Sequence, residues 1–280
     1  MSARALSAAP VTAAEAELTL QPPAAPLLVA EQVTLRYGRL TAVDSVDLRI
    51  LPGARHALIG PNGAGKSSLF SVLSGAVRAT SGRIGFAGDD VSSAGEAERA
   101  RRGLVRTYQH STLFLGLSVV DNVRVAVERR AGHPLRPWPS RADRRLASEA
   151  RDRLDQVGLG SRAEDPVSAL SHGERRQLEV AVVLACEPRL VLFDEPTAGM
   201  SAAETQRFAE VVESLPEDMA TVIVEHDLDV VFRLADRISV LAAGRLIAEG
   251  TPEQVRADER VREAYLGVDR SDDPLFGGQG

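Results

Sequence analysis

The chain contains one cysteine, Cys186, among its 280 residues. This excludes an intramolecular disulfide and any metal site built from several cysteines. Cys186 ends the apolar run "VAVVLAC", so we expect it to pack in the core. The longest uninterrupted apolar runs are about seven residues, far below the roughly 18 that a membrane-spanning helix needs, and we expect no such helix.

Concentrated positive charge is also scarce. Lys and Arg total 33 against 39 Asp and Glu, the formal net charge is −6, and charges of both signs are interspersed. A nucleic-acid backbone is bound by a basic face, so we expect no nucleic-acid partner. With 44% hydrophobic residues, the chain can fill the core of one sizeable domain with an insert, or of two small domains.

Between its ends the chain alternates short β-branched runs with helical patterns, which predicts an α/β fold with a mixed, partly parallel sheet. Residues 33–37 and 45–50 predict an antiparallel β subdomain. The runs that predict strands of the central sheet are 55–60, 189–195, 221–226 and 237–244. The Arg/Ala/Glu-rich stretch of about 89–185 predicts a helical subdomain inserted in this core. The Ala/Pro-rich residues 1–26 predict a disordered arm without a secretory signal, and residues 268–280 predict a flexible tail.

Lysine is nearly absent: of the 33 Lys and Arg residues, only Lys66 is a lysine. It lies in Gly60-Pro61-Asn62-Gly63-Ala64-Gly65-Lys66-Ser67, which matches G-x-x-x-x-G-K-[ST] between an apolar strand and a helical pattern. Loop N–H groups and a helix N-terminus can hold a polyphosphate there, while Lys66 contacts its β- and γ-phosphates and Ser67 can bind Mg²⁺. The planar fork of an arginine cannot make the same compact contact. We predict a nucleotide site here, extending to Ser68; a glycine-rich turn that matches by chance is the alternative.

Three further side chains are candidates for the chemistry of this site. The buried run "LVLFDEP" ends in Asp194, which can hold Mg²⁺ through water, and Glu195, which can polarise an attacking water. An acidic turn at a strand end is the alternative for this pair. His226 follows the strand "TVIVE", where a lone histidine is more often structural.

Taken together, these motifs resemble the ATP-binding subunits of ABC transporters over about residues 27–267. The motifs stand in the order of that family: "RYG" with Tyr37, the phosphate loop, Gln109 after a short strand, the signature "LSHGE", "LVLFDE" and "VEH". The resemblance implies a P-loop ATPase cassette that uses ATP and Mg²⁺. It implies that Tyr37 stacks on adenine, and that Ser67 and Gln109 ligate Mg²⁺ with support from Asp194. It further implies that Glu195 is the general base and that His226 contacts the γ-phosphate and the attacking water.

The resemblance also implies a site shared between two cassettes. Ser171 and Gly173, at the start of the signature helix, would contact the γ-phosphate bound by a second cassette. A heterodimer with a related ATPase subunit is expected, and a homodimer is the alternative. His172, Glu174 and Ser201 depart from the common family pattern, which bears on coupling between the cassettes and not on phosphate binding.

The C-terminal run ending in "EAYLG" and the stretch "RTYQHSTLFLGLSVVDNVRVA" resemble the ATP-binding subunits of importers of branched-chain amino acids. The resemblance then implies permease subunits as partners, a solute-binding protein as an indirect partner, and a location in the cytoplasm at the inner face of the membrane. Importers of urea, other amides or other amino acids share the pattern. A soluble ABC ATPase without a permease and a small-molecule kinase are the other classes; the signature argues against the kinase, which needs no second cassette.

Overall fold

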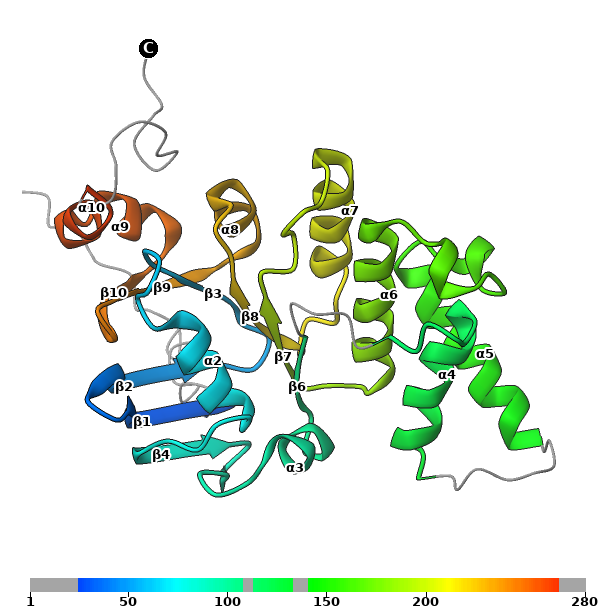
Figure 1. The fold of residues 1–280 in the computed structure, drawn as a ribbon, viewed down its shortest axis with the longest axis horizontal. Helices are drawn as coiled ribbons and strands as arrows, with labels where there is room; N and C mark the ends of the chain where they lie inside the picture. The colour runs from blue at the N-terminus through cyan, green and yellow to red at the C-terminus, as the bar shows by residue number, and fades with distance from the viewer. Residues whose placement is uncertain (1–24, 108–112, 133–140, 267–280) are drawn as a thin grey trace, which may run out of the picture.

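The computed structural model describes residues 25–107, 113–132 and 141–266. Two sheets lie side by side, and a group of helices stands at the far end of the larger one (Figure 1). Nearly all of the predicted arm and tail lies outside the described residues. Within those residues, no helix combines the length and the apolar character that crossing a bilayer requires.

The smaller sheet is antiparallel, in the order β2-β1-β4-β5. Its strands are β1 (Leu28–Tyr37), β2 (Leu40–Ile50), β4 (Ser81–Phe86) and β5 (Asp89–Asp90). In β2 the buried residues Val46, Leu48 and Ile50 alternate with exposed ones, so one face is covered and the other faces solvent. The covered face shares a core with Phe70 of the helix after the phosphate loop, which places this sheet beside that loop.

The larger sheet has the order β10-β9-β3-β8-β7-β6. Its strands are β3 (Arg55–Ile59), β6 (Leu104–Arg106), β7 (Leu190–Asp194), β8 (Ala220–Val224), β9 (Arg237–Ala242) and β10 (Arg245–Gly250). All neighbours pair in parallel except β10, and β7 and β8 are buried along their whole length. The carboxyl ends of β3, β7 and β8 therefore meet at one edge of the sheet, where ligands bind in open α/β folds.

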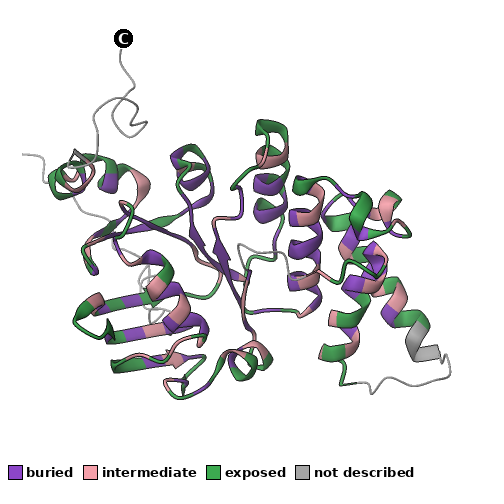
Figure 2. Ribbon diagram, viewed as in Figure 1, coloured by how far each residue is buried: buried purple, intermediate pink, exposed green. Residues whose placement is uncertain are grey.

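Helices cover both sheets and form the far end of the molecule. Their bounds are α2 (Lys66–Ser74), α3 (Glu96–Arg101), α4 (Val119–Arg130), α5 (Arg141–Gln156), α6 (His172–Ala185), α7 (Ala202–Glu213), α8 (Leu228–Leu234), α9 (Pro252–Ala257) and α10 (Glu259–Leu266). Short 3₁₀ turns at Gly160–Arg162 and Val167–Ala169 connect α5 to α6. The helices α4, α5 and α6 bury their facing sides, with Val123, Leu154 and Leu178 in one core (Figure 2).

The helical region begins later than the sequence pattern suggests. Residues from 89 onward first form β5, which extends the small sheet, then α3 and β6, which pairs with β7 in the large sheet. The helices that pack on one another start at α4. β6 is the short strand expected before Gln109, whereas β5 has two residues, which is too short to show an alternating pattern.

Cys186 caps the carboxyl end of α6 and is partly buried. Its Sγ donates to the carbonyl of Val182 at 3.5 Å, and burial raises the pKa of the thiol. A raised pKa disfavours the reactive thiolate, so this cysteine behaves as a packing residue.

Candidate functional site

In the loop between β3 and α2, two glycines lie close against the backbone of other segments. Gly60 has φ of 150° and Gly65 has φ of 101°. A Cβ on Gly60 would lie 2.0 Å from the carbonyl oxygen of Leu241, and one on Gly65 would lie 2.2 Å from that of Ala42. Glycine is required at both positions because any side chain would collide with backbone that cannot move aside.

The Lys66 side chain folds back over this loop. Its Nζ donates to the carbonyl of Gly60 at 2.6 Å and to that of Pro61 at 3.1 Å. Lys66 is buried, which lowers the pKa of its ammonium, while the nearby charge of Glu195 acts in the opposite direction. The ammonium is thus held in the concave face of the loop by weak acceptors that a phosphate can replace. Ser67, the next residue, is exposed.

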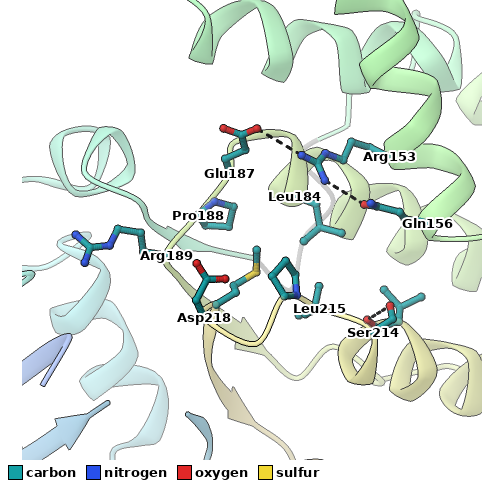
Figure 3. A pocket seen from close by; sticks show the side chains of 12 residues that line it. Arg153, Gln156, Leu184, Glu187, Pro188, Arg189, Ser214, Leu215 and Asp218 are labelled. Carbon is teal, nitrogen blue, oxygen red and sulfur yellow. Dashed lines mark hydrogen bonds and ion pairs between the residues drawn. The ribbon is translucent and has the colours of Figure 1, made fainter. Parts of the chain in front are cut away.

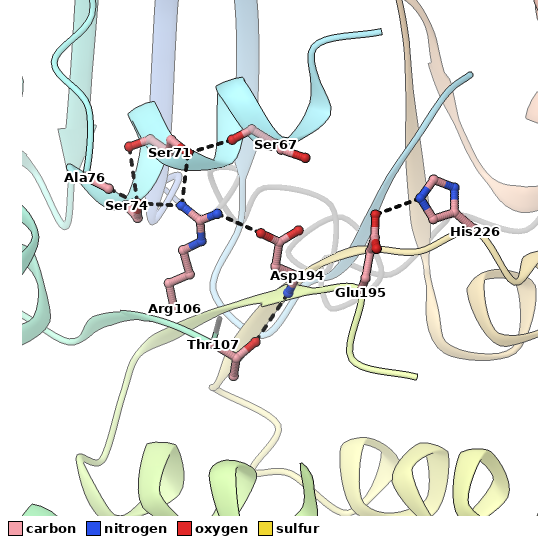
Figure 4. A network of polar contacts seen from close by, with 9 residues as sticks. All are labelled: Ser67, Ser71, Ser74, Ala76, Arg106, Thr107, Asp194, Glu195 and His226. Atoms are coloured by element: carbon pink, nitrogen blue, oxygen red, sulfur yellow. Dashed lines mark hydrogen bonds and ion pairs between the residues drawn. The ribbon is translucent and has the colours of Figure 1, made fainter. Parts of the chain in front are cut away.

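The carboxyl end of β7 presents two carboxylates in different surroundings (Figure 4). Asp194 is 3% exposed, and its Oδ2 accepts from Arg106 at 2.6 Å. Its Oδ1 is buried without a hydrogen-bond partner among the described residues. Glu195 lies beside it with φ of 47°, and its Oε1 pairs with Nε2 of His226 at 2.7 Å. One carboxylate is therefore neutralised and hidden, and the other faces a histidine at the surface.

A cavity of about 490 Å³ brings most of the predicted site residues together. The lining combines the phosphate loop with residues that follow β7 and β8 and with residues near the turn between β1 and β2. The lining residues are Tyr37, Leu40, Thr41, Ala42, Asn62, Gly63, Ala64, Gly65, Lys66, Ser67, Ser68, Glu195, His226, Ala243 and Gly244. Tyr37 is half-exposed at its rim. Such a site has room for an aromatic base at one end and a polyphosphate at the other.

Ser171 and Gly173 are not among the residues that line this cavity. Ser171 caps α6 instead: its Oγ accepts from the N–H of Glu174 at 3.2 Å, and the Glu174 carboxylate accepts from the N–H of Ser171 at 2.7 Å. Glu174, an unusual residue in the signature, thus completes a capping box. Within one chain, the start of α6 therefore adds no residue to the cavity that contains the phosphate loop.

The other two unusual residues join α6 to the loop before α7. His172 Nε2 lies 3.3 Å from the carbonyl oxygen of Ala198, and Ser201 caps α7 in a capping box with Glu204. Glu204 also lies 3.4 Å from Ser171 Oγ, and its hydrogen bonds with Ser201 lower the pKa of its carboxyl. The sequence did not single out Glu204; the spacing S-x-x-E before a helix could have identified it.

Gln109 lies outside the described residues. The end of β6 and the residue after it supply two contacts to Asp194: the Arg106 ion pair, and the Thr107 hydroxyl, which accepts from the Asp194 N–H at 3.3 Å. Neither residue was predicted from the sequence. No local signal marks them, because both contacts depend on the pairing of β6 with β7.

A larger cavity of about 720 Å³ lies elsewhere, between the end of α6, α5 and the loop after α7 (Figure 3). Its charged residues Arg153 and Glu187 pair with each other at 3.5 Å, and Leu184, Leu215 and Met219 supply apolar surface. None of the predicted site residues lines it. The chemistry of the lining, and not the volume, distinguishes the candidate site.

Comparison with known proteins agrees with this geometry. Residues 43–198 match the ABC transporter family, and residues 245–271 match the family described as branched-chain amino acid ATP-binding cassette transporter. The chain is 37% identical over 250 residues to the high-affinity branched-chain amino acid transport ATP-binding protein LivG of Escherichia coli K12, covering 86% of this chain and 98% of LivG. It is 34% identical, with the same coverage, to BraF of Pseudomonas aeruginosa, which has the same description.

Solved structures give the same result. The ADP conformation of MJ1267, an ATP-binding cassette of an ABC transporter, matches with a TM-score of 0.75 and 28% identity, over 87% of this chain and 99% of that one. CbiO1 of Clostridium perfringens, part of an ABC transporter complex, matches with a TM-score of 0.72 and 26% identity, over 87% and 96%. The chain belongs to the ABC transporter family, as an ATP-binding cassette subunit with the fold of a P-loop ATPase.

Proposed function

We propose that this ATPase subunit hydrolyses MgATP to drive an importer of branched-chain amino acids, acting in the cytoplasm at the inner face of the membrane. The observation that supports ATP hydrolysis is that Lys66, Glu195 and His226 line the same cavity. The solute assignment is supported by the LivG and BraF relatives and by the match at residues 245–271.

The residues divide the work of hydrolysis. Loop N–H groups and the start of α2 bind the phosphates, and the Lys66 ammonium moves from its carbonyl acceptors to the β- and γ-phosphates. Glu195 accepts a proton from water as the water oxygen bonds to the γ-phosphorus, and the bond from that phosphorus to the β–γ bridging oxygen breaks. His226 keeps the Glu195 carboxylate turned to the cavity through their 2.7 Å hydrogen bond.

The residues around the phosphate loop suit a magnesium ion. Asp194 offers a buried oxygen without a partner among the described residues, and Ser67, which is exposed and lines the cavity, offers a hydroxyl. Ser67, Asp194 and Gln109 would hold Mg²⁺ together with phosphate oxygens. When bound, the ion would neutralise charge on the transferred phosphoryl group. The described residues contain no cluster of three His, Cys, Asp or Glu side chains that could bind a metal unaided, which is consistent with an ion delivered by the nucleotide.

A second cassette would complete the site. Ser171 and Gly173 do not line the cavity of their own chain, which supports a role in capping a nucleotide bound by another subunit. A related but distinct cassette is the partner that we expect, and two copies of this chain are the alternative.

An apolar surface near α4 provides a docking place for the permease. Phe114, Leu115, Leu117 and Val125 are large hydrophobic residues with 37–58% of their surface exposed. Asn122 ties this loop to α4 by accepting from the Phe114 N–H at 2.8 Å and donating to the Phe114 carbonyl at 3.1 Å. The groove between α4 and α6 has a volume of about 190 Å³ and is largely apolar. We assign it to a short amphipathic cytoplasmic helix of the permease, since such a helix would cover the exposed apolar residues.

Reconstitution tests the transport assignment. The chain, purified from membranes together with its co-purifying subunits and solute-binding protein, is placed in vesicles, and ATP-dependent uptake of radiolabelled leucine, isoleucine and valine is compared with uptake of urea. Uptake of the three amino acids is expected. Uptake of urea alone would reassign the solute, and a chain that hydrolyses ATP but never co-purifies with membrane subunits would favour a soluble ABC ATPase.

A further inference from the structure

Arg106, the last residue of β6, is a buried cation directly beside Asp194 (Figure 4). Its side chain is 8% exposed and that of Asp194 is 4% exposed. One guanidinium nitrogen donates to Asp194 Oδ2 at 2.6 Å, and the other donates to Ser71 Oγ at 3.1 Å and Ser74 Oγ at 3.4 Å. The fork of the arginine thus joins the end of β7 to α2, the helix that begins with Lys66 and Ser67.

This contact determines how the Asp194 carboxylate can be used. Oδ2 is occupied by Arg106, while Oδ1 is buried without a hydrogen-bond partner among the described residues. The Thr107 hydroxyl accepts from the Asp194 N–H and holds the backbone at the same point. The carboxylate is therefore fixed in rotation, with one oxygen left for a further ligand.

The charge of Arg106 has a second effect. A buried carboxylate without a counter-ion would attract any divalent cation, whereas the Asp194–Arg106 pair is neutral. A divalent cation beside this pair would also be repelled by the guanidinium. The phosphates of the nucleotide bring the negative charge that offsets this repulsion.

We propose that Arg106 is a positioning residue of the magnesium site, which holds Asp194 in place and prevents divalent cations from binding before the nucleotide does. This inference rests on the magnesium role of Asp194 in the proposed function. It predicts opposite effects of one substitution: without Arg106, metal binding in the absence of nucleotide improves, and turnover of MgATP declines. A residue needed only for folding would not produce this pair of effects.

The test measures Mn²⁺ binding by electron paramagnetic resonance on the purified full chain without nucleotide, and MgATP turnover of the same preparations with the partner cassette present. In Arg106→Gln, Mn²⁺ should bind at least about tenfold more tightly than in the parent, because the local positive charge is gone. Its turnover should fall by roughly tenfold or more, because Asp194 is no longer oriented. Arg106→Lys keeps the charge but not the fork, so its Mn²⁺ binding should stay as weak as in the parent while turnover still falls.

Arg102→Gln is the matched control, since Arg102 caps the carboxyl end of α3 shortly before β6 and its ion pairs with Glu98 and Asp89 are at the surface. It should leave both measurements unchanged. Thermal unfolding of each variant shows whether it folds, and Arg106→Lys carries the test if Arg106→Gln does not fold.

The proposal is overturned if a folded Arg106→Gln binds Mn²⁺ no more tightly than the parent, or if Arg106→Lys hydrolyses MgATP at the parent rate. A parent chain that fails to hydrolyse MgATP with its partner cassette present would instead contradict the proposed function, so the two failures are distinguishable.

Discussion

Glu195 is not a glycine, yet its backbone φ of 47° lies in the region that favours glycine. Such a conformation costs on the order of 1–3 kcal/mol and persists only where the surroundings impose it. Here the Glu195 N–H donates to the carbonyl of Val224 at 2.9 Å, and its carboxylate pairs with His226. The strained backbone turns the carboxylate into the cavity, away from its neighbour Asp194.

Glu195→Gln should retain ATP binding and lose turnover by about 10²-fold or more, because the amide cannot accept the proton of the attacking water. The phosphate loop is untouched by this change. Nucleotide affinity by equilibrium binding and phosphate release at saturating ATP measure the two effects. A variant with turnover near that of the parent would remove Glu195 from the role of general base.

Lys66→Arg should lose nucleotide binding or hydrolysis almost as completely as Lys66→Ala. The ammonium fits between the carbonyls of Gly60 and Pro61, and the larger planar guanidinium cannot occupy the same position. The same two assays apply, with circular dichroism as a control for folding. Activity in the arginine variant close to that of the parent would show that charge alone is needed.

At the scale of helices and strands, the sequence predicted those parts of the site that are local in the chain. The phosphate loop, Asp194, Glu195 and His226 each follow directly from a strand pattern, so their neighbours in sequence are also their neighbours in space. Tyr37 also lines the cavity, and its stacking on adenine stays a prediction.

The remainder depended on pairing between distant segments. Arg106 and Asp194 are 88 positions apart in the chain, and their contact exists only because β6 pairs with β7 in one register. The sequence indicates a short strand before Gln109, but β6 has only three residues and nothing in them identifies β7 as its partner. The contact of Glu204 with Ser171, which joins α7 to α6, spans 33 positions and also depends on how distant segments pack.

The strand β3, which leads into the phosphate loop, has a built-in dependence on pH. His56 is buried between β8 and β9, with Nε2 2.8 Å from Ser239 Oγ, and burial lowers its pKa from 6.5 to about 4. Between these two values the unfolded chain binds a proton that the folded chain does not, so stability falls as the pH falls through this window.

Across that window this effect should remove about 3 kcal/mol of the free energy of unfolding, a contribution that His56→Gln should abolish. Urea titrations followed by circular dichroism, at intervals from pH 7 to pH 4, measure the slope in the parent and the variant. Curves that run parallel would show that His56 is not responsible.

At the scale of the whole molecule, we propose that the cavity and the start of α6 belong to two different nucleotide sites. The cavity contains Lys66 and Glu195, whereas Ser171 does not line it and is held by Glu174 close to Glu204. On this proposal one chain supplies only part of each site. Its activity should depend on a second cassette with the opposite half.

If two copies of this chain form the dimer, the specific ATPase activity of the purified chain should rise with protein concentration and disappear on dilution. Mixing two inactive variants, Lys66→Ala and Ser171→Arg, should restore some activity, because one site of the mixed dimer combines an intact loop with an intact signature. Size-exclusion chromatography at each concentration gives the oligomeric state. Constant activity at concentrations where only monomer is present would place the whole site in one chain.

The single lysine makes the phosphate loop open to a specific kind of proteolysis. An endoproteinase that cleaves only after lysine has one target in the entire chain, the bond after Lys66, and can release only the fragments 1–66 and 67–280. Lys66 is buried with its Nζ held by two carbonyl groups, so this bond is cut only when the loop opens. The rate of that one cleavage reports the local opening of the loop, and its slowing by nucleotide would measure occupancy without any label or mutation.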